Sequence, residues 1–175
     1  MLAKTFAAKA APTGGDVMDN VKLAECHSRN LRKGRHSETG FAYLLTAVTD
    51  KRRLLFTQYP LGRLLVAELR SAEASGLVQS LAWVVMPEHF HWLITLQSGT
   101  LSALMQRVKG RSAIAINRSM GEQGGIWQKG FYDHALRSDE DLQDIARYIV
   151  ANPLRACLVE KIGDYPLWDA IWVGA

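Results

Sequence analysis

The sequence predicts an α+β fold of the ferredoxin-like, split βαβ type, in which helices pack on one face of an antiparallel sheet. The main observation is the order of the expected elements, which runs strand, helix, strand, strand, helix, strand, helix. The second is size, because 175 residues with 48% hydrophobic side chains suit a single domain with a sizeable core. No internal repeat interrupts this order.

The first strand is expected at residues 41–49, where β-branched, aromatic and small apolar side chains precede the polar turn TDKRR. The segment RLLF, residues 53–56, can then serve as its hairpin partner. A helix begins at Pro60, because proline suits the first helical turn, and its leucines recur at helical spacing until Gly76 ends it.

Two consecutive strands are expected in the middle of the chain. VQSLAWVVM is apolar on both faces and is typical of a buried central strand. The overlapping stretch MPEHFHWLI continues across a proline into a second strand, close enough to form a hairpin with the first. Because strand side chains alternate, His89 and His91 share one face, and Phe90 and Trp92 share the other. One face is therefore expected to be core, and the other to carry two nitrogen ligands.

A second helix is expected at residues 101–120, where an apolar stripe is interspersed with basic side chains. Its candidate DNA-binding residues are Arg107, Lys109 and Arg111, which can face either solvent or a nucleic-acid backbone. The loop EQGG follows, and the aromatic-rich segment WQKGFYDHALR after it is typical of a strand.

The third helix is expected within SDEDLQDIARYIVANP. Ser138 and Asp141 form a capping box at its start, and Pro153 ends it. Tyr148 and Asn152 are one turn apart on a face other than the apolar stripe, so both can face the histidine strand. Equally, the tyrosine can pack its ring on the sheet and the asparagine can simply end the helix, because a residue before proline is biased out of helical geometry.

The histidine pair and the tyrosine have a joint chemical logic. A divalent ion held by His89, His91 and a side-chain oxygen keeps open positions for a phosphate oxygen, which it polarises as a nucleophile attacks. The pair alone is weak evidence, because two ligands do not close a metal site. Attack by Tyr148, a phenol with an ordinary pKa of about 10, leaves a phosphotyrosine bond and keeps the phosphodiester available for rejoining. Attack by water instead hydrolyses the phosphodiester and forms no phosphotyrosine bond. This difference distinguishes strand transfer from nuclease action.

Composition and charge permit a nucleic-acid partner and argue against membrane and secreted classes. The chain has 21 Lys and Arg against 17 Asp and Glu, so it leans basic. Its two cysteines fit no metal-ligand spacing and no disulfide framework, which favours a reducing cytoplasm. No apolar run is long enough to span a membrane, and the N-terminus lacks the apolar core of a secretory signal.

The chain divides into two expected parts. Residues 1–27 are small, polar and punctuated by Gly and Pro, which is typical of a flexible tail. Residues 28–175 are expected to form one folded domain with a basic N-terminal arm and a short C-terminal extension. In the arm, SRNLRKGRH, the cations Arg32, Lys33 and Arg35 have no acidic neighbour. Such a run is either a solvated segment or a grip on phosphates.

Three motifs resemble, in order and spacing, those of the REP-associated tyrosine transposases, a branch of the single-tyrosine HUH transposases. The motifs are MPEHFHWLI, WQKGFYDHALRSDEDL and YIVANPLRACLV, and the similarity covers residues 31–166, with LRKGR at its start. The resemblance implies a ferredoxin-like HUH domain that binds and cleaves single-stranded DNA near small palindromic hairpins, the repetitive extragenic palindromes. It also implies a 5′-phosphotyrosine intermediate and a requirement for Mg²⁺ or Mn²⁺.

The resemblance assigns roles to individual residues. His89 and His91 become the metal ligands and Tyr148 the nucleophile. Asn152 falls where related transposases place a polar third ligand. Three other side chains can substitute for that ligand, namely Asp144, Glu88 and His134. Cys157 is a departure, because the family commonly has glycine there, but it touches no proposed catalytic atom.

The resemblance also implies where DNA binds. It makes Arg32, Lys33 and Arg35 readers or clamps of the bases that flank the hairpin. The aromatic side chains of Trp127, Phe131 and Tyr132 either stack on bases or pack in the core. In related transposases the tyrosine helix serves its own histidines or those of a partner subunit, so a monomer and a homodimer are both compatible with the sequence. A bacterial cytoplasmic, nucleoid-associated location is expected of this class.

Two other functions are compatible with the same residues. One is a protein that holds hairpins without cutting them, and the other is a metal-dependent nuclease or phosphodiesterase that uses water. The three functions predict different products: a covalent protein–DNA adduct, no cleavage, and cut DNA without an adduct. Tyr165 lies outside the tyrosine helix and is assigned no catalytic role.

Overall fold

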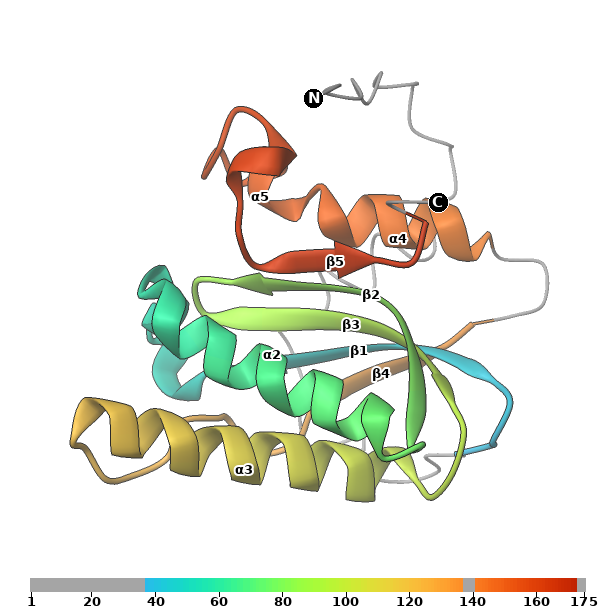
Figure 1. Ribbon diagram of the computed structural model, residues 1–175, viewed down its shortest axis with the longest axis horizontal. Helices are drawn as coiled ribbons and strands as arrows, with labels where there is room; N and C mark the ends of the chain where they lie inside the picture. Colours follow the sequence, from blue (N-terminus) through green and yellow to red (C-terminus); the bar gives the residue numbers. More distant parts are fainter. Residues whose placement is uncertain (1–36, 137–140, 173–175) are drawn as a thin grey trace.

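The computed structural model describes residues 37–136 and 141–172 as an α+β fold built on one antiparallel sheet (Figure 1). The sheet has five strands in the order β4-β1-β3-β2-β5, and every neighbouring pair is antiparallel. The strands are β1 (Ala42–Val48), β2 (Val78–Met86), β3 (His89–Leu96), β4 (Tyr132–Ala135) and β5 (Trp168–Ala170). The predicted fold class is confirmed, and β2 and β3 form the expected hairpin.

Four α-helices accompany the sheet in the described residues. They are α2 (Tyr59–Ala74), α3 (Leu101–Met120), α4 (Leu142–Val150) and α5 (Asn152–Arg155). Short 3₁₀ turns lie at η2 (Asp50–Arg52), η3 (Leu55–Thr57) and η4 (Ile162–Asp164). In residues 53–56, the expected hairpin partner of β1, the structure has no strand and η3 begins there, so that prediction is wrong. The reason is that β3 and β4 already occupy both edges of β1.

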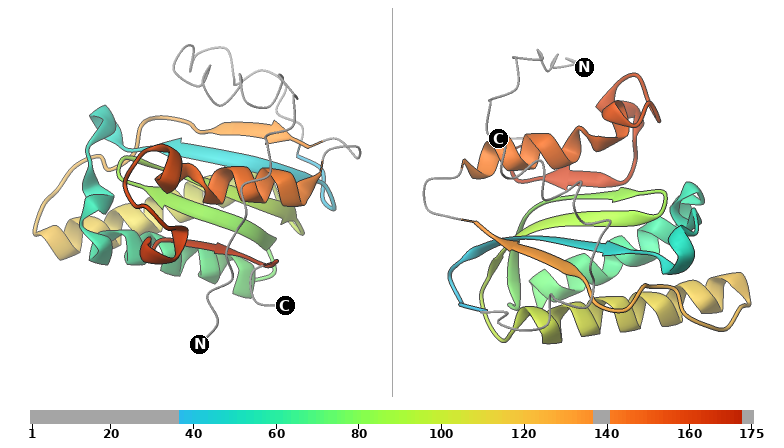
Figure 2. Two further views of the ribbon diagram at one scale, coloured as in Figure 1. Left: turned by 90° about the horizontal axis from the view of Figure 1, so that it is seen from above. Right: turned by 180° about the vertical axis from the view of Figure 1, so that it is seen from behind.

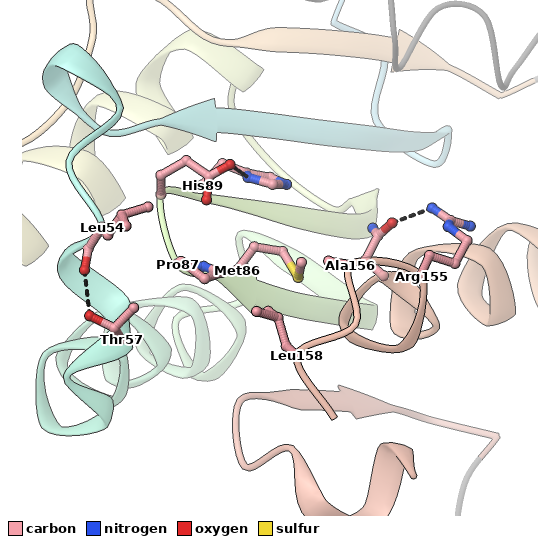
Figure 3. Close-up of a pocket in the computed structure, with 10 residues that line it drawn as sticks. Leu54, Thr57, Met86, Pro87, His89, Arg155, Ala156 and Leu158 are labelled. Atoms are coloured by element: carbon pink, nitrogen blue, oxygen red, sulfur yellow. Dashed lines mark hydrogen bonds and ion pairs between the residues drawn. The ribbon is translucent and has the colours of Figure 1, made fainter. Parts of the chain in front are cut away.

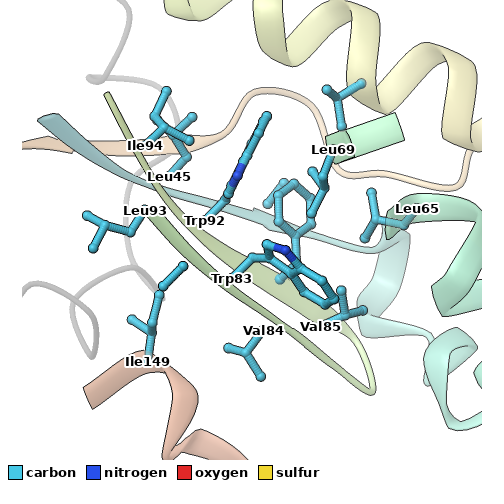
Figure 4. Packing of buried hydrophobic residues seen from close by; sticks show 14 of the residues in the cluster. Leu45, Leu65, Leu69, Trp83, Val84, Val85, Trp92, Leu93, Ile94 and Ile149 are labelled. Carbon is cyan, nitrogen blue, oxygen red and sulfur yellow. The ribbon is translucent and has the colours of Figure 1, made fainter. Parts of the chain in front are cut away.

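The helices cover both faces of the sheet, and the expectation of helices on one face only is wrong (Figure 2). Strand register places Val84 and Leu93 on the same face as the two histidines, which we call the histidine face. Helix α4 packs there, with Ile149 beside Val84 and Leu93, whereas α2 brings Leu65 to the opposite face (Figure 4). Because the histidine face also carries apolar residues, the apolar stripe of α4 is buried against it.

The opposite face holds most of the aromatic core. Trp127 lies 5.6 Å from Phe56 and 5.4 Å from Phe90 between ring centroids, and its indole nitrogen donates to the Ser112 hydroxyl of α3. It joins the sheet through a single bridge to Thr49, so β4 is shorter than the strand expected around it. Of the two roles left open for Trp127, the structure shows core packing.

Strand β5 had no counterpart in the expected elements, because it lies in what was taken as a C-terminal extension. Its three residues pair with β2 and cover an edge that would otherwise be open. Just before it, the buried Tyr165 hydroxyl donates to the carbonyl of Val85 at 2.7 Å, and burial raises the pKa of this phenol to about 12. Tyr165 therefore anchors the C-terminal segment to the sheet.

Candidate functional site

The two histidines lie side by side at the start of β3, next to the tight turn of the β2–β3 hairpin. Their ring centroids are 4.8 Å apart, and His91 is buried. The hairpin turn is held by Thr49, whose backbone N–H donates to the Glu88 carbonyl at 2.8 Å. The Thr49 hydroxyl lies 3.0 Å from the same carbonyl and is fully buried. This anchoring places Glu88 and the imidazoles at a defined position on the histidine face.

Each imidazole uses its Nδ1 atom to bind a neighbouring side chain. His89 Nδ1 lies 3.1 Å from Glu88 Oε1, and His91 Nδ1 lies 2.7 Å from the Thr46 hydroxyl on β1. Because a carboxylate only accepts, His89 carries its proton on Nδ1 and presents the lone pair of Nε2. The Thr46 hydroxyl can accept from His91 Nδ1 in the same way, and in that tautomer His91 also presents the lone pair of Nε2. Neither Nε2 atom makes a hydrogen bond within the described residues.

The electrostatics keep His91 in the form that a ligand needs. Burial, the neighbouring His89 and the charge of Arg155 hold the pKa of His91 well below its ordinary value. The hydrogen bond from His89 lowers the pKa of Glu88 despite its partial burial. A neutral imidazole beside an ionised carboxylate is the arrangement that orients histidine toward a metal ion. Two imidazole nitrogens suit a divalent metal ion only with further ligands, and the choice of Mg²⁺ or Mn²⁺ stays a prediction.

Helix α4 carries Tyr148 onto the histidine face. The helix starts later than expected, because Asp141 itself is the N-cap and accepts from the backbone N–H groups of Gln143 and Asp144 at 2.8 and 3.3 Å. The proposed capping role of Asp141 three residues into the helix is thus wrong, and Ser138 lies outside the described residues. Tyr148 is half-buried, and its hydroxyl makes no hydrogen bond within the described residues.

The chain does not leave helical geometry at Pro153, as was expected. Ala151 has φ −76° and ψ −1°, and the next residue begins α5, in which Pro153 occupies the first turn. Proline is tolerated there because its missing N–H has no partner to lose. Asn152 therefore stays close to the tyrosine helix, and it lines the same pocket as His89.

Asn152 and Arg155 form a contact that bears on the predicted third ligand. Arg155 donates to the Oδ1 atom of Asn152, and the Asn152 Nδ2 atom is buried without a partner in the described residues. The amide oxygen keeps a second lone pair, but a metal ion bound to it would lie next to the guanidinium charge. The contact with Arg155 therefore competes electrostatically with metal binding by Asn152.

The substitutes for the third ligand are engaged elsewhere. Asp144 pairs with Arg147 at 2.6 Å on the exposed side of α4. Glu88 binds His89, as described above, and also lies 3.7 Å from Arg52. His134 lies on the histidine face, but two strands away on β4, opposite Leu44. Among the described residues, no group of three His, Cys, Asp or Glu side chains is placed to hold a metal ion.

Arg155 is the residue of this site that the sequence analysis missed. Its guanidinium lies 3.6 Å from the centroid of the Tyr148 ring, and it donates to the Tyr148 carbonyl at 3.2 Å. It thus connects the predicted nucleophile, the predicted third ligand and the electrostatic surroundings of His91. Arg155 is seven residues after Tyr148, which in a continuous helix puts the two residues on one face, two turns apart. The sequence analysis ended the helix at Pro153 and therefore did not consider this pair.

A pocket of about 540 Å³ lies beside these side chains (Figure 3). Its polar lining includes Glu88, His89, Asn152 and Arg155. Its apolar lining is contributed by Leu54, Met86, Pro87, Ala156 and Leu158, of which Leu54 and Leu158 are exposed at 61% and 43%. The site is therefore open to a large substrate and offers it both charged and apolar contacts.

The predicted DNA contacts are distributed differently. Arg107 donates to Ser75 at 3.0 Å, Lys109 to the Gln128 carbonyl at 2.7 Å, and Arg111 pairs with Glu68 at 2.7 Å. All three thus tie α3 to neighbouring elements on the face opposite the histidines, and their role in binding DNA stays a prediction. Arg32, Lys33 and Arg35 lie outside the described residues.

The aromatic residues proposed to stack on bases, in and before β4, differ in burial. Phe131 is buried, whereas Tyr132 is half-buried on β4, opposite Thr46. Because Thr46 contacts His91, Tyr132 lies in the same row across the histidine face. Of the three aromatics, Tyr132 is the one that the sheet directs toward the site.

Fold and site together define a DNA-processing enzyme of the transposase class, and the chain belongs to the family described as "Transposase IS200 like", which matches residues 37–152. The REP-associated tyrosine transposase of Escherichia coli is 29% identical over 136 residues, or 75% of this chain and 78% of that protein. A solved REP-associated tyrosine transposase bound to a REP hairpin has a TM-score of 0.64 and 27% identity, covering 78% of this chain and 81% of that one. The resemblance found in the sequence is confirmed.

The described residues were also tested for membrane-spanning helices. None of the helices within residues 37–136 and 141–172 combines the length and the apolar character needed to cross a bilayer.

Proposed function

We propose that this protein is a single-tyrosine DNA strand transferase that acts on single-stranded DNA carrying palindromic hairpins of the REP type. One observation carries the proposal: two adjacent imidazoles present free Nε2 atoms on the sheet face where the tyrosine helix packs. The family implies DNA processing, and a tyrosine on the helix that packs on the histidine face supports a covalent route specifically.

In this proposal the chain's own residues do the following. His89 and His91 hold Mg²⁺ or Mn²⁺, which supplies polarisation of a phosphate oxygen when bound. The Tyr148 hydroxyl loses its proton and bonds to phosphorus, and the bond from phosphorus to the 3′ oxygen breaks. The products are a 5′-phosphotyrosine on the protein and a free 3′ hydroxyl on the DNA. Reversal with another 3′ hydroxyl joins strands without further energy input.

Hairpin recognition is part of the same proposal. The relative that is 27% identical was solved bound to a REP hairpin, and this chain shares its fold over most of the length of both. The arm residues Arg32, Lys33 and Arg35 are the proposed contacts to phosphates and flanking bases. The net charge of +4 supports such a partner.

A denaturing gel tests the chemistry. An oligonucleotide with a REP-like hairpin and a single-stranded flank, incubated with Mn²⁺, should form a covalent adduct with the protein. The adduct should be absent with Tyr148→Phe and present with Tyr59→Phe, a matched change of an exposed tyrosine. His89→Ala should abolish cleavage but keep most of the DNA affinity, because basic side chains supply that affinity.

The other two functions are outcomes of the same gel. Cut DNA without an adduct would replace the proposal with a water-using nuclease. Hairpin binding without cleavage under either metal would leave a binding protein. An adduct that persists in Tyr148→Phe would assign the nucleophile to another residue.

A further inference from the structure

Arg155 is a cation whose contacts in the described residues are all neutral. It binds the ring and the carbonyl of Tyr148 and the amide oxygen of Asn152, and it makes no ion pair there. Other arginines pair with acids, as in Arg53–Glu122, Arg70–Asp169, Arg111–Glu68 and Arg147–Asp144. Arg155 is exposed, so its uncompensated charge is available to a ligand.

The surroundings of Arg155 in the described residues supply no carboxylate that pairs with it. It lines the pocket together with His89, and it is close enough to His91 to contribute to the lowered pKa of that imidazole. Glu88 is the one carboxylate in the pocket lining, and it is already bound to His89 and lies near Arg52. A divalent metal ion on the histidines would bring a second cation toward Arg155, which is unfavourable unless an anion lies between them.

We propose that Arg155 binds a backbone phosphate of the substrate strand at or next to the cleaved bond. The inference rests on the proposed function, since it takes DNA as the substrate. A phosphate supplies the missing anion, and the planar guanidinium suits two parallel hydrogen bonds to its oxygens. The stacking on Tyr148 keeps the guanidinium, and hence the phosphate, beside the proposed nucleophile.

Binding of the phosphate also explains how Asn152 can serve as a ligand. A phosphate bound by Arg155 would draw the guanidinium toward its own oxygens and offset the charge of the cation. The Oδ1 atom of Asn152 could then turn toward a metal ion on the histidines. Arg155 therefore exchanges one partner for another, and substrate binding prepares the third ligand that the free protein keeps occupied.

The pocket accommodates the rest of a nucleotide. Its volume of about 540 Å³ lies within the usual range for ligand sites. Met86 and Leu158 lie between His89 and Arg155 in Figure 3, where a sugar or base of the flank can pack.

The test measures DNA affinity without metal, in EDTA, so that it does not depend on cleavage. A hairpin with a single-stranded flank is prepared as a series in which one phosphate at a time is a neutral methylphosphonate. Wild-type protein should lose about tenfold in affinity at one flank position, the loss expected for one charged hydrogen-bonded contact. Arg155→Gln should show that loss with the unmodified strand and no further loss at the sensitive position.

Two variants control for charge and folding. Arg147→Gln, a change of an ion-paired arginine on the neighbouring helix, should keep the wild-type sensitivity at the same position. Arg155→Lys should keep part of the affinity, because it retains the charge but not the planar pair of donors. Equal methylphosphonate profiles for wild type and Arg155→Gln would overturn the proposal, as would equal affinities of the two for the unmodified strand.

The exchange at Asn152 has its own readout. In DNA-free protein, Arg155→Gln should bind Mn²⁺ several-fold more tightly than wild type, because a cation is removed and the Asn152 oxygen is released. Unchanged or weaker Mn²⁺ binding, measured by electron paramagnetic resonance, would overturn the exchange. These measurements are independent of the adduct gel, so a missing phosphotyrosine and a missing phosphate contact are distinguishable.

Discussion

Glu88 and Thr46 orient the rings of His89 and His91, but only the contact of Glu88 could be predicted from the sequence. Glu88 adjoins His89 in the chain, so its contact is local. Thr46 is forty-five residues from His91 and meets it because β1 and β3 pair in a particular register. A hydrogen bond to Nδ1 sets which nitrogen can bind a metal, so both partners matter to the proposed site.

Replacing Thr46 with valine tests this orientation. Thr46→Val keeps the shape of the side chain but removes the partner of His91 Nδ1, which frees the ring to adopt the other tautomer. Mn²⁺ affinity of the DNA-free protein should fall by about tenfold or more, the usual loss for such partners. Thr95, on β3, makes no comparable contact in the described residues, so Thr95→Val should leave the affinity unchanged. Equal Mn²⁺ affinities for wild type and Thr46→Val would contradict the role of Thr46 in orienting His91.

At the scale of elements, the end of α5 explains the departure noted at Cys157. The N–H of Cys157 donates to Leu154 and that of Leu158 to Pro153, at 3.0 and 2.9 Å, which is the Schellman pattern of a helix C-terminus. The pattern requires a left-handed residue, and Cys157 has φ +53°. Glycine adopts this conformation without strain, which is the physical reason for the family's preference.

Cys157→Gly should therefore stabilise the protein. Removal of the strained side chain is worth about 1 kcal/mol, partly offset by the greater freedom of glycine in the unfolded chain. Urea unfolding should show a higher midpoint for Cys157→Gly. Cys157→Ala, which keeps the Cβ atom and removes only the thiol, should leave the midpoint near that of wild type. A lower midpoint for the glycine variant would refute the explanation.

At the scale of the whole molecule, the basic residues predicted to bind DNA form two groups, and the structure describes only the group on α3. The arm precedes β1, whereas the basic side chains of α3 bind α2 and the 121–131 loop on the face away from the histidines. The two regions should therefore respond differently when they are neutralised.

Replacing Arg32, Lys33 and Arg35 with glutamine should lower hairpin affinity and reduce its salt dependence, without changing the unfolding temperature. Replacing Arg107, Lys109 and Arg111 with glutamine should instead lower stability by about 1–3 kcal/mol, because the partly buried Glu68 loses its paired cation, and the Gln128 carbonyl and the Ser75 hydroxyl lose their donors. Salt titrations of DNA binding and thermal unfolding of both variants check this. An α3 variant that stays stable but loses DNA affinity would contradict this structural role and support a DNA contact by α3.

The elements with strong local patterns were predictable. The leucine spacing of α2 and the apolar stripe of α4 each reflect a burial pattern with a fixed period, whereas β3 is buried on both faces. The missed elements lack such a pattern: β5 has three residues, and the 3₁₀ turns replaced a strand because no edge of β1 was open. The start of α4 was misplaced because several polar residues in succession can each cap a helix.

By itself, the sequence determined the family, the fold class and the presence of a histidine pair and a tyrosine, because residue type and spacing carry that information. Tertiary structure alone decided what each of these groups touches. Strand register brought Thr46 to His91, the helical path through Pro153 brought Arg155 over Tyr148, and the packing of α4 placed both on the histidine face. These contacts join residues far apart in the chain, or across a proline, and their geometry depends on packing that no local pattern encodes.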